Sequence, residues 1–486
     1  MSAVGLYFLI VPFVVALLAP LFQRALAPRW LAALTALSLA APASFAAYVI
    51  MSGSKYAYEF VSAPALGSFM VIVDGLNWPI IVGVAVVSSA IAFYSVPYMS
   101  KRFEEEKRGD WGAYFMLYGL FAASMIGMAE ANNFIMFYLF LELALIPSFV
   151  LIALYGYGDR GRISSLYFIW THVGALTFLT GAFIYGIELR TFNFYPVPAN
   201  ASLLASYAVV IVMLLMVGLF IKMAVFGVHA WLPYAHAEAP TPISALLSPN
   251  LIGIAGYAIV RIVYGVFPSY LIEAQWVIVA FALATIFYGG LLVFRQWDLK
   301  RLLAYSSIAQ MGYVLLGIAS LNPLGIAGAI LQFYSHAIGK SLLFSSAGVM
   351  ITENDGLRDV NKMGGLAKKM PYTASLSLWG FMNISGLPPS IGFFSKLFIL
   401  MGVASAFMPR GSWGLLVFAL SLVSLGITPA YSFVTMKKVF FGPLGNQSAK
   451  EGTLMLLIPM VVIAIFGLLF FVFPSVLLTP LYAYLR

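Results

Sequence analysis

Apolar stretches of about 18 residues or more recur along almost the whole chain, and this repetition constrains the fold most. Each such stretch is long enough to cross, as a helix, a hydrocarbon core about 30 Å thick. Hydrophobic residues fill 62% of the 486 positions and charged residues only 9%, against about 25% charged in a soluble domain. We therefore expect an all-α polytopic membrane protein with no soluble domain.

Counting the apolar runs between charged or Pro/Gly-rich breaks predicts about 14 transmembrane helices. The run at the N-terminus lacks a charged leading region, so we expect it to remain as the first helix. The predicted spans lie near residues 4–23, 30–51, 71–99, 111–129, 132–155, 164–188, 203–228, 243–266, 272–295, 301–320, 324–352, 372–401, 412–441 and 453–483.

Lysine and arginine are distributed unevenly between the two sets of loops. Eighteen of the 26 lie in loops after odd-numbered spans, Lys300 among them, and five lie on the other side, Arg261 among them. By the positive-inside rule the odd loops are cytoplasmic and both termini lie outside, as expected for the plasma membrane of a cell. The net charge of +9 is then an orientation signal and requires no nucleic-acid partner.

The residue types exclude several kinds of cofactor chemistry. The sequence has no cysteine, which rules out thiolate-bound iron–sulfur clusters, disulfides and a catalytic thiol. Its four histidines are too few and too scattered to indicate haem or zinc, and no Gly-rich phosphate loop is present. We expect no cofactor, so any electrons or nucleotides are handled by other subunits.

Four charges stand inside apolar stretches: Lys222, Lys340, Lys396 and Glu142. A charge at bilayer depth costs several kcal/mol, about 3 on insertion scales, and typically marks a proton relay or an ion path. A carboxylate–ammonium pair interacts by about 4 kcal/mol at 4 Å for an effective dielectric near 20. Breaking that pair is enough to release a proton, so these charges indicate ion movement through the membrane.

Two spans carry signals of a broken helix. The seventh reads GLFIKMAVFGVHAWLPYAHAEAPTPISALL and the twelfth GFMNISGLPPSIGFFSKLFIL, with Gly and Pro beside Lys222 and Lys396. The eleventh, FYSHAIGKSLLF, predicts a milder break at Gly339. Broken helices at corresponding places in two halves point to a transport site. If spans 4–8 and 9–13 are repeats, their odd number makes them inverted.

Five segments carry a resemblance to a known family. FLFLELALIPSFVLIALYG, KMAVFGVHAWLPYAHAEAPTPISALL, DLKRLLAYSSIAQMGYVLLGI, HAIGKSLLF and GLPPSIGFFSK occur in this order over most of the chain. They resemble the antiporter-like subunits of respiratory complex I, energy-converting membrane-bound hydrogenases and Mrp-type sodium/proton antiporters. The resemblance implies 14 helices, discontinuous helices 7 and 12, a water-filled charged axis and membrane subunits as partners.

The resemblance also divides the chain. It implies N-terminal helices 1–3 in residues 1–110, a first inverted five-helix repeat in 111–270, a second in 271–441, and helix 14 in 442–486. It implies an ion path through matching positions. Glu142 and Lys222 match an ion pair on helices 5 and 7, Lys340 matches a relay lysine on helix 11, and Lys396 the terminal lysine of helix 12. Histidines beside the breaks match His229 and His336.

Two positions depart from the family pattern. Many relatives carry a lysine in helix 8 that bridges the two halves, where SPNLIGIAGYAIVRI has Gly253. The central relay then runs through water or a histidine, or is absent. Helix 7 lacks the usual prolines before His229 and has Ala224 and Gly227, which predicts a softer break.

The polar residues also have structural interpretations. A Lys–Glu pair can simply fix helix packing, Lys396 can snorkel to an interface, and a histidine can donate to carbonyls freed at a break. We expect His236 and Glu238 to shape their loop and His172 to be a satisfied polar group. Glu130 is expected to be a solvated helix end, although a place in a proton exit is the alternative.

Two classes of function fit these observations. The first is a proton-translocating subunit of a redox-driven assembly, with quinone, F(420), ferredoxin or hydrogen chemistry in partner subunits. The second is a Na+/H+ antiporter subunit of an Mrp-type assembly, and a weaker third is a transporter that acts alone. No sodium-binding cage is recognisable, so the sequence leaves H+ and Na+ both open.

Overall fold

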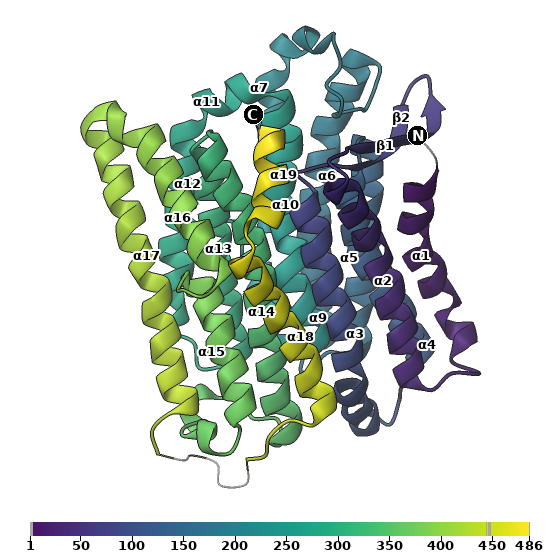
Figure 1. Cartoon of the computed structure of the whole chain (residues 1–486), viewed down its shortest axis with the longest axis vertical. Coiled ribbons are helices and arrows are strands. Elements are labelled where there is room, and N and C mark those ends of the chain that lie inside the picture. The colour runs from purple at the N-terminus through teal and green to yellow at the C-terminus, as the bar shows by residue number, and fades with distance from the viewer. Residues whose placement is uncertain (1–2, 444, 446–448, 486) are drawn as a thin grey trace.

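The computed structural model describes residues 3–443, 445 and 449–485, which form a bundle of helices with one hairpin. Helices account for 79% of the residues that the structure describes. Eleven helical stretches in the described part are long and apolar enough to cross a membrane. They run side by side between two ends of the bundle (Figure 1). The predicted class, a helical polytopic membrane protein, is confirmed.

The elements follow the predicted spans closely in order along the chain. The N-terminal half contains α1 (Val4–Phe22), α2 (Pro28–Met51), β1 (Tyr56–Ala63), β2 (Gly67–Val73), α3 (Trp78–Glu106), α4 (Trp111–Glu130), α5 (Phe134–Tyr155), α6 (Arg160–Leu189), η1 (Ala201–Ser206), α7 (Ala208–Met223), α8 (Trp231–Glu238), α9 (Thr241–Leu246), η2 (Leu247–Leu251), α10 (Ile252–Ala258) and η3 (Ile259–Tyr264). The C-terminal half contains α11 (Pro268–Glu273), α12 (Gln275–Val293), α13 (Leu299–Ala319), α14 (Pro323–Glu353), η4 (Val360–Lys362), η5 (Leu366–Lys368), α15 (Pro371–Ser385), α16 (Ile391–Phe407), η6 (Met408–Arg410), α17 (Gly411–Phe440), α18 (Leu454–Val472) and α19 (Ser475–Leu485).

The hairpin corrects the expectation of a purely helical chain. Strands β1 and β2 pair antiparallel, with Tyr56 opposite Val73 and Ala63 opposite Gly67. The third predicted span was wrong at its start because residues 71–73 belong to β2, and α3 begins only at Trp78. The apolar, β-branched run FMVIV that closes β2 is as compatible with a strand as with the start of a helix. The hairpin lies at the end of the bundle where the N-terminus lies (Figure 1).

The centre of the bundle is formed by the stretch from α9 to η3 together with α13 and α14. Every residue of the most apolar window in 241–264 is buried, and 94% of the corresponding window of α13. The peripheral helix α1, by contrast, is only 28% buried in its window and directs leucine and valine side chains outward. Apolar side chains on the outside and polar groups inside are the arrangement expected of a protein surrounded by lipid.

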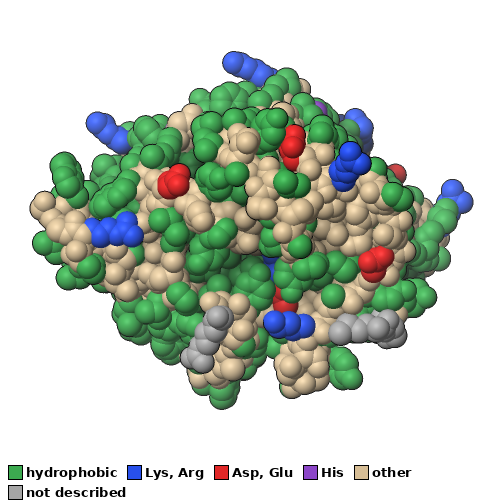
Figure 2. Space-filling view, turned by 90° about the horizontal axis from the view of Figure 1, so that it is seen from above, with side chains coloured by type: hydrophobic (Ala, Val, Ile, Leu, Met, Phe, Trp, Pro, Cys, Tyr) green, Lys and Arg blue, Asp and Glu red, His purple; other side chains and the backbone are tan. Residues whose placement is uncertain are grey.

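Both chain ends lie at the same end of the bundle (Figure 1). Viewed from above, this molecule presents mostly hydrophobic side chains and backbone, with charged side chains scattered singly (Figure 2).

A buried ion pair corrects the placement of Arg261 in a loop. Arg261 lies in η3, is 2% exposed, and binds both carboxylate oxygens of Asp74 at 2.7 and 2.8 Å. The hydroxyls of Tyr257 and Tyr484 accept further bonds from its guanidinium. Burial opposes ionisation of Asp74, but the charge and hydrogen bonds of Arg261 outweigh it and lower the pKa of this loop carboxyl. The pair ties α3, η3 and α19 together.

Candidate functional site

Four lysines lie inside the bundle, one more than predicted. Lys222 and Lys396 are each 4% exposed, and Lys300 and Lys340 are fully buried. None of the four forms an ion pair with a carboxylate within 4.0 Å in the part of the chain that the structure describes. Buried ammonium groups without a carboxylate partner are costly, so these four lysines are the candidate functional groups.

Two of these lysines lie beside complete helix breaks. Helix α7 ends one residue after Lys222, and Ala224 (φ 56°) and Gly227 (φ 91°) take the left-handed conformation before α8 begins. The softer break expected here is therefore wrong. Trp231 satisfies one freed carbonyl by donating from Nε1 to Ile221 O at 2.9 Å. The partial negative charge at the end of α7 favours a cation at Lys222.

The second break separates α15 from α16. Gly386 has φ 75°, and α16 begins at Ile391 and carries Lys396 in its second turn. A Cβ on Gly386 would lie 2.7 Å from Lys396 Cδ, so a glycine is required for the lysine to pass this close. By contrast, α14 runs without interruption from Pro323 to Glu353, and the mild break predicted at Gly339 is wrong.

In the first half of the bundle, Glu142 pairs with a histidine instead of Lys222. His172 Nδ1 lies 3.2 Å from both carboxylate oxygens of Glu142, connecting α5 to α6. The ammonium of Lys222 makes no hydrogen bond to described residues and borders a cavity of about 10 Å³. That volume is at the lower limit for one water molecule. The direct Glu142–Lys222 pair implied by the resemblance is absent from this arrangement, and His172, expected to be a satisfied polar group, is hydrogen-bonded to Glu142.

In the second half, Lys340 is held by hydrogen bonds. Its Nζ donates to Leu303 O at 2.8 Å and to the hydroxyl of Ser306, both on α13. On the next residue, Ser307 bonds to Ser248 of η2 at 2.7 Å. The ammonium therefore lies where α13, α14 and η2 meet, at the centre of the bundle.

A chain of neutral polar side chains continues from Lys340 towards Lys396. Gln310, one turn along α13 from Ser306, accepts a bond of 2.8 Å from Gln332 of α14. Gln332 in turn accepts a bond of 2.6 Å from Ser395, the neighbour of Lys396. On α14 the residues at positions 332, 336 and 340 are spaced four apart and share one face of the helix.

A second branch of this chain leads to Tyr313, whose ring faces Lys396. Gln310 donates to Tyr431 at 3.0 Å and to Thr428 at 3.3 Å. The ammonium of Lys396 has no hydrogen-bond partner among described residues, but stands 4.2 Å from the centre of the Tyr313 ring. A cation over an aromatic face is attracted to the ring quadrupole without being fixed by a counter-ion.

The histidines occupy three different environments. His336 is fully buried one turn before Lys340, and neither ring nitrogen makes a hydrogen bond in the described structure. His229 is half-buried between α7 and α8, with its ring 4.7 Å from that of Tyr288. His236, expected to shape a loop, is fully buried against Phe344, and its ring nitrogens also lack partners there.

Two charged residues assigned to solvent are buried. Lys300 follows the N-cap Asp298, and its Nζ donates to the carbonyl of Ala239 and lies 5.7 Å from the Tyr157 ring. It was placed in a loop because Asp298 and Arg301 flank it in sequence. Glu130, expected to be solvated, is 2% exposed. Both expectations were wrong because segments distant in sequence cover these helix ends.

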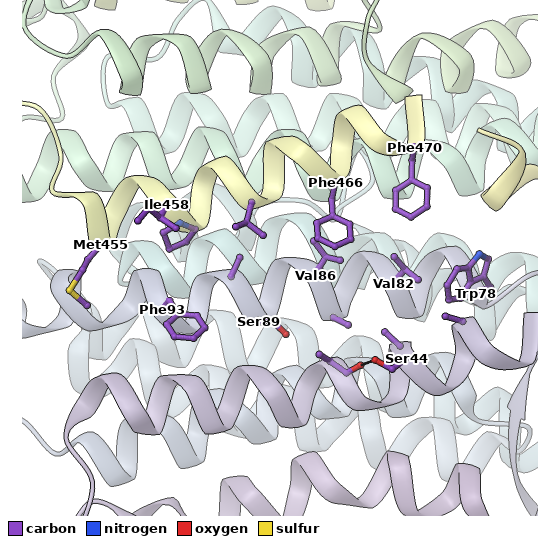
Figure 3. A pocket seen from close by; sticks show the side chains of 17 residues that line it. Ser44, Trp78, Val82, Val86, Ser89, Phe93, Met455, Ile458, Phe466 and Phe470 are labelled. Carbon is purple, nitrogen blue, oxygen red and sulfur yellow. Dashed lines mark hydrogen bonds between the residues drawn. The ribbon is translucent and has the colours of Figure 1, made fainter. Parts of the chain in front are cut away.

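A large apolar cavity lies away from the lysines. It has a volume of about 660 Å³ and runs between α2, α3 and α18, lined by small residues on α2 and by Phe466 and Phe470 on α18 (Figure 3). Its two serines, Ser44 and Ser89, already donate to carbonyls of their own chain. No titratable side chain lines it, so it is not part of the candidate site. Among the described residues, no cluster of His, Asp and Glu is arranged to hold a metal ion.

Comparison with known proteins identifies the family. A family model described as "NADH:quinone oxidoreductase/Mrp antiporter, TM" matches residues 131–411, more than half of the chain. The chain belongs to this family of antiporter-like membrane subunits. The F(420)H(2) dehydrogenase subunit M of Methanosarcina mazei is 33% identical over 450 residues, covering 88% of this chain and 86% of the relative.

Solved structures show the same fold. A chain of the Mrp complex from Dietzia sp. has a TM-score of 0.85 at 22% identity, covering all of this chain and 98% of that one. A chain of respiratory complex I from Thermus thermophilus with bound NADH has a TM-score of 0.82 at 24% identity, covering 99% and 98%. The antiporter-like fold therefore extends over the whole chain, including both helix breaks.

Proposed function

We propose that this antiporter-like subunit translocates protons along a buried axis formed by Glu142, Lys222, His229, His336, Lys340 and Lys396. The observation that carries the proposal is the polar chain from Lys340 through Gln310 and Gln332 to Ser395, beside Lys396. The bonds Gln332–Gln310 and Ser395–Gln332 form a short hydrogen-bonded chain that lies between the two ammonium groups in an apolar bundle, and such a chain provides positions at which a proton can be passed on. We propose that Lys300 belongs to the same set.

Electrostatics supplies the coupling between carriers. Two nearby ammonium groups repel one another strongly in a medium of low dielectric, so a proton arriving at one lysine favours release from the next. Glu142 acts as the gate, because its carboxylate stabilises a charged Lys222 when it approaches and destabilises it when it turns towards His172. The pairing of Glu142 with His172 at 3.2 Å supports a gate with two partners.

The lining of the axis favours H+ over Na+. Lysine ammoniums repel a metal cation, and the amide and hydroxyl groups of Gln310, Gln332 and Ser395 are engaged with one another. Hard cations require several free oxygen ligands, usually including carboxylates. A chain of lysines and neutral polar groups suits a proton, which a lysine binds covalently.

We infer a redox-driven assembly of the complex I type as the parent complex. The M. mazei relative is a dehydrogenase subunit, and the T. thermophilus structure is a respiratory complex with NADH. Because this sequence has no cysteine to hold an iron–sulfur cluster, the redox chemistry takes place in partner subunits. A Na+/H+ antiporter subunit of an Mrp-type assembly is the second candidate, favoured by the TM-score of 0.85 to the Dietzia chain.

We propose 14 membrane crossings, with inverted repeats in 111–270 and 271–441 flanked by segments 1–110 and 442–486. Supporting this, breaks adjoin Lys222 and Lys396 at corresponding places in the two repeats. An even number of crossings also agrees with both termini lying at one end of the bundle (Figure 1). We place that end on the outer side of the plasma membrane, because the lysine-rich loops are then cytoplasmic.

Identification of the partner subunits tests the parent assembly. Mass spectrometry of what co-purifies with this chain in mild detergent should find iron–sulfur and quinone- or hydrogenase-type subunits. In that assembly, Lys222→Ala should abolish proton pumping and slow the coupled redox turnover. Recovery of small hydrophobic antiporter subunits alone would instead support Na+/H+ exchange, and full pumping by Lys222→Ala would contradict the buried axis.

A further inference from the structure

The central position where many relatives carry a lysine is blocked in this chain. Gly253 of α10 faces α14, and a Cβ on it would lie 2.5 Å from Cδ2 and 2.9 Å from Cε2 of Phe333. An aromatic ring therefore fills the space that a side chain at 253 needs. Neither residue carries a proton, so a path between the two halves requires other groups.

Asn250 lies one turn before Gly253, and its own side-chain carboxamide has no hydrogen-bond partner among the described residues. It belongs to η2, a π-helical segment, and is fully buried. Neither its Nδ2 nor its Oδ1 has a hydrogen-bond partner among the described residues. Buried carboxamides are nearly always hydrogen-bonded to protein or to ordered water, and π-helical segments occur frequently at functional sites.

On one side, the helix that carries Asn250 borders the cavity at Lys222. Leu251, Ile254 and Ala255 line this cavity of about 10 Å³ together with Lys222, whose ammonium is also without a partner in the described structure. Ile254 follows Asn250 by four residues and therefore projects from the same side of the helix. The volume of this cavity is at the lower limit for one water molecule.

On the other side, the same segment touches α14 at His336. The His336 ring faces the backbone carbonyl of Pro249, the residue before Asn250. Both ring nitrogens are buried, and neither has the distance and angle of a hydrogen bond to a described residue. One turn further along α14, Lys340 begins the polar chain of the second half. Three unsatisfied polar groups, at Lys222, Asn250 and His336, thus lead towards Lys340.

We propose that Asn250 and His336 hold a short chain of ordered water that joins Lys222 to Lys340 in place of the lysine missing at position 253. This inference rests on the proposed function. Lys222 gives a proton to the first water, each water breaks one O–H bond as it forms another, and a ring nitrogen of His336 takes the last proton. His336 then releases the proton on its other nitrogen towards Lys340, with no change of electrons.

Asn250 is a positioning residue in this sequence of steps. A carboxamide does not ionise, but it offers two donors and an acceptor, so it orients water in both directions. Phe333 closes the direct route through Gly253 and confines water to the side of η2. The junction is thus made of neutral groups, apart from the histidine that carries the proton.

The test compares variants of the intact assembly, reconstituted in liposomes with a pH-sensitive dye inside. A potassium diffusion potential drives proton entry, so the assay needs no redox substrate. Asn250→Leu should lower the rate at least about tenfold, whereas Asn250→Gln, which keeps the carboxamide, should retain most of it. The melting temperature of Asn250→Leu should change little, because the carboxamide has no hydrogen bond to described residues to lose. Ile252→Leu, on the same helix, is the matched control.

Lys222→Ala separates a failure of the water junction from a failure of the proposed function. If Lys222→Ala loses flux and Asn250→Leu keeps the wild-type rate, the water junction is wrong and the proton axis stands. If Lys222→Ala keeps full flux, the proposed function itself is wrong, and the junction with it. Loss of flux in both Asn250 variants together with a lower melting temperature would assign Asn250 a purely structural role.

Discussion

The two halves of the bundle place their lysines in different surroundings. In the first half Lys222 has no hydrogen-bonding partner among described residues and borders a cavity lined by apolar side chains. In the second half Lys340 is bonded to Leu303 O and Ser306, and glutamines lead on towards Lys396. On the proposed axis, the first half would therefore need water to pass a proton, whereas the second half contains bonded polar side chains between its two lysines.

This difference has a physical consequence. A path made of side chains is present whenever the protein is folded, but a path made of water conducts only when the cavity is hydrated. The first half, with Glu142 held by His172 next to it, is thus suited to be the gated step. Substitutions at Lys340, Gln332, His172 and Asp74 should affect transport in that order, from the largest effect to the smallest.

The largest effect is expected for Lys340→Met, which keeps the length of the side chain and removes the ammonium. Loss of a proton carrier should slow proton entry into liposomes by about a hundredfold or more. Lys101→Met is the matched control, because Lys101 is half-exposed and pairs with Glu353 at 2.9 Å. Wild-type flux in Lys340→Met would remove the second half from the path.

Breaking the glutamine chain should have an intermediate effect. Gln332→Leu removes the bonds to Gln310 and Ser395, and we expect proton entry to fall about tenfold, since water can replace part of the chain. The double variant with Gln310→Leu should be no slower than the single one, because both break one path. Gln296→Leu, whose amide bonds only to its own helix, serves as the control. Additive losses would show that the two glutamines act separately.

A smaller effect is expected at the gate. His172→Phe frees Glu142 to approach Lys222, which should hold the proton there and slow transport about two- to fivefold, as fits a partly exposed pair worth up to about 1 kcal/mol. Glu142→Gln in the same background should restore part of the rate because it removes the attraction. Stopped-flow proton entry measures both. Faster transport in His172→Phe would contradict the assignment of Glu142 as a gate.

The smallest effect on transport is expected for Asp74→Asn, although it should destabilise the fold most. Breaking a buried ion pair costs about 3–5 kcal/mol, so the melting temperature should fall while the flux per folded molecule stays at the wild-type value. The lowered pKa of Asp74 means that its contribution is complete above about pH 4 and lost as the pH falls through its folded pKa. The fall in melting temperature that Asp74 causes in the wild type at acid pH should be absent from Asp74→Asn. A lower flux per folded molecule would place this pair in the path.

The sequence predicted those features that stand out against an apolar background. Lys222, Lys340 and Lys396 were found because each is a lone charge in a hydrophobic run. The breaks beside Lys222 and Lys396 were found from nearby Gly and Pro, although the first was expected to be softer than it is. Gln310 and Gln332 were missed because a neutral residue does not stand out in a hydrophobic run as a charge does. The spacing of four between Gln332, His336 and Lys340 could have indicated that Gln332 shares a helix face with the other two.

Other features depend on contacts that a linear pattern does not contain. Lys300 is buried because Ala239 and Tyr157 cover the start of α13, and the pairing of Glu142 with His172 depends on how α5 packs against α6. The ring of Phe333 at Gly253 is likewise a tertiary contact. A charge count assigns such residues to loops or to the wrong partner.

Potential-driven proton entry into liposomes without sodium tests the central claim most directly. The intact assembly should acidify the vesicle interior at the same rate with and without Na+, and Lys222→Ala should reduce that rate to the level of empty liposomes. Entry that requires sodium, or that continues unchanged in Lys222→Ala, would contradict a proton axis through the buried lysines.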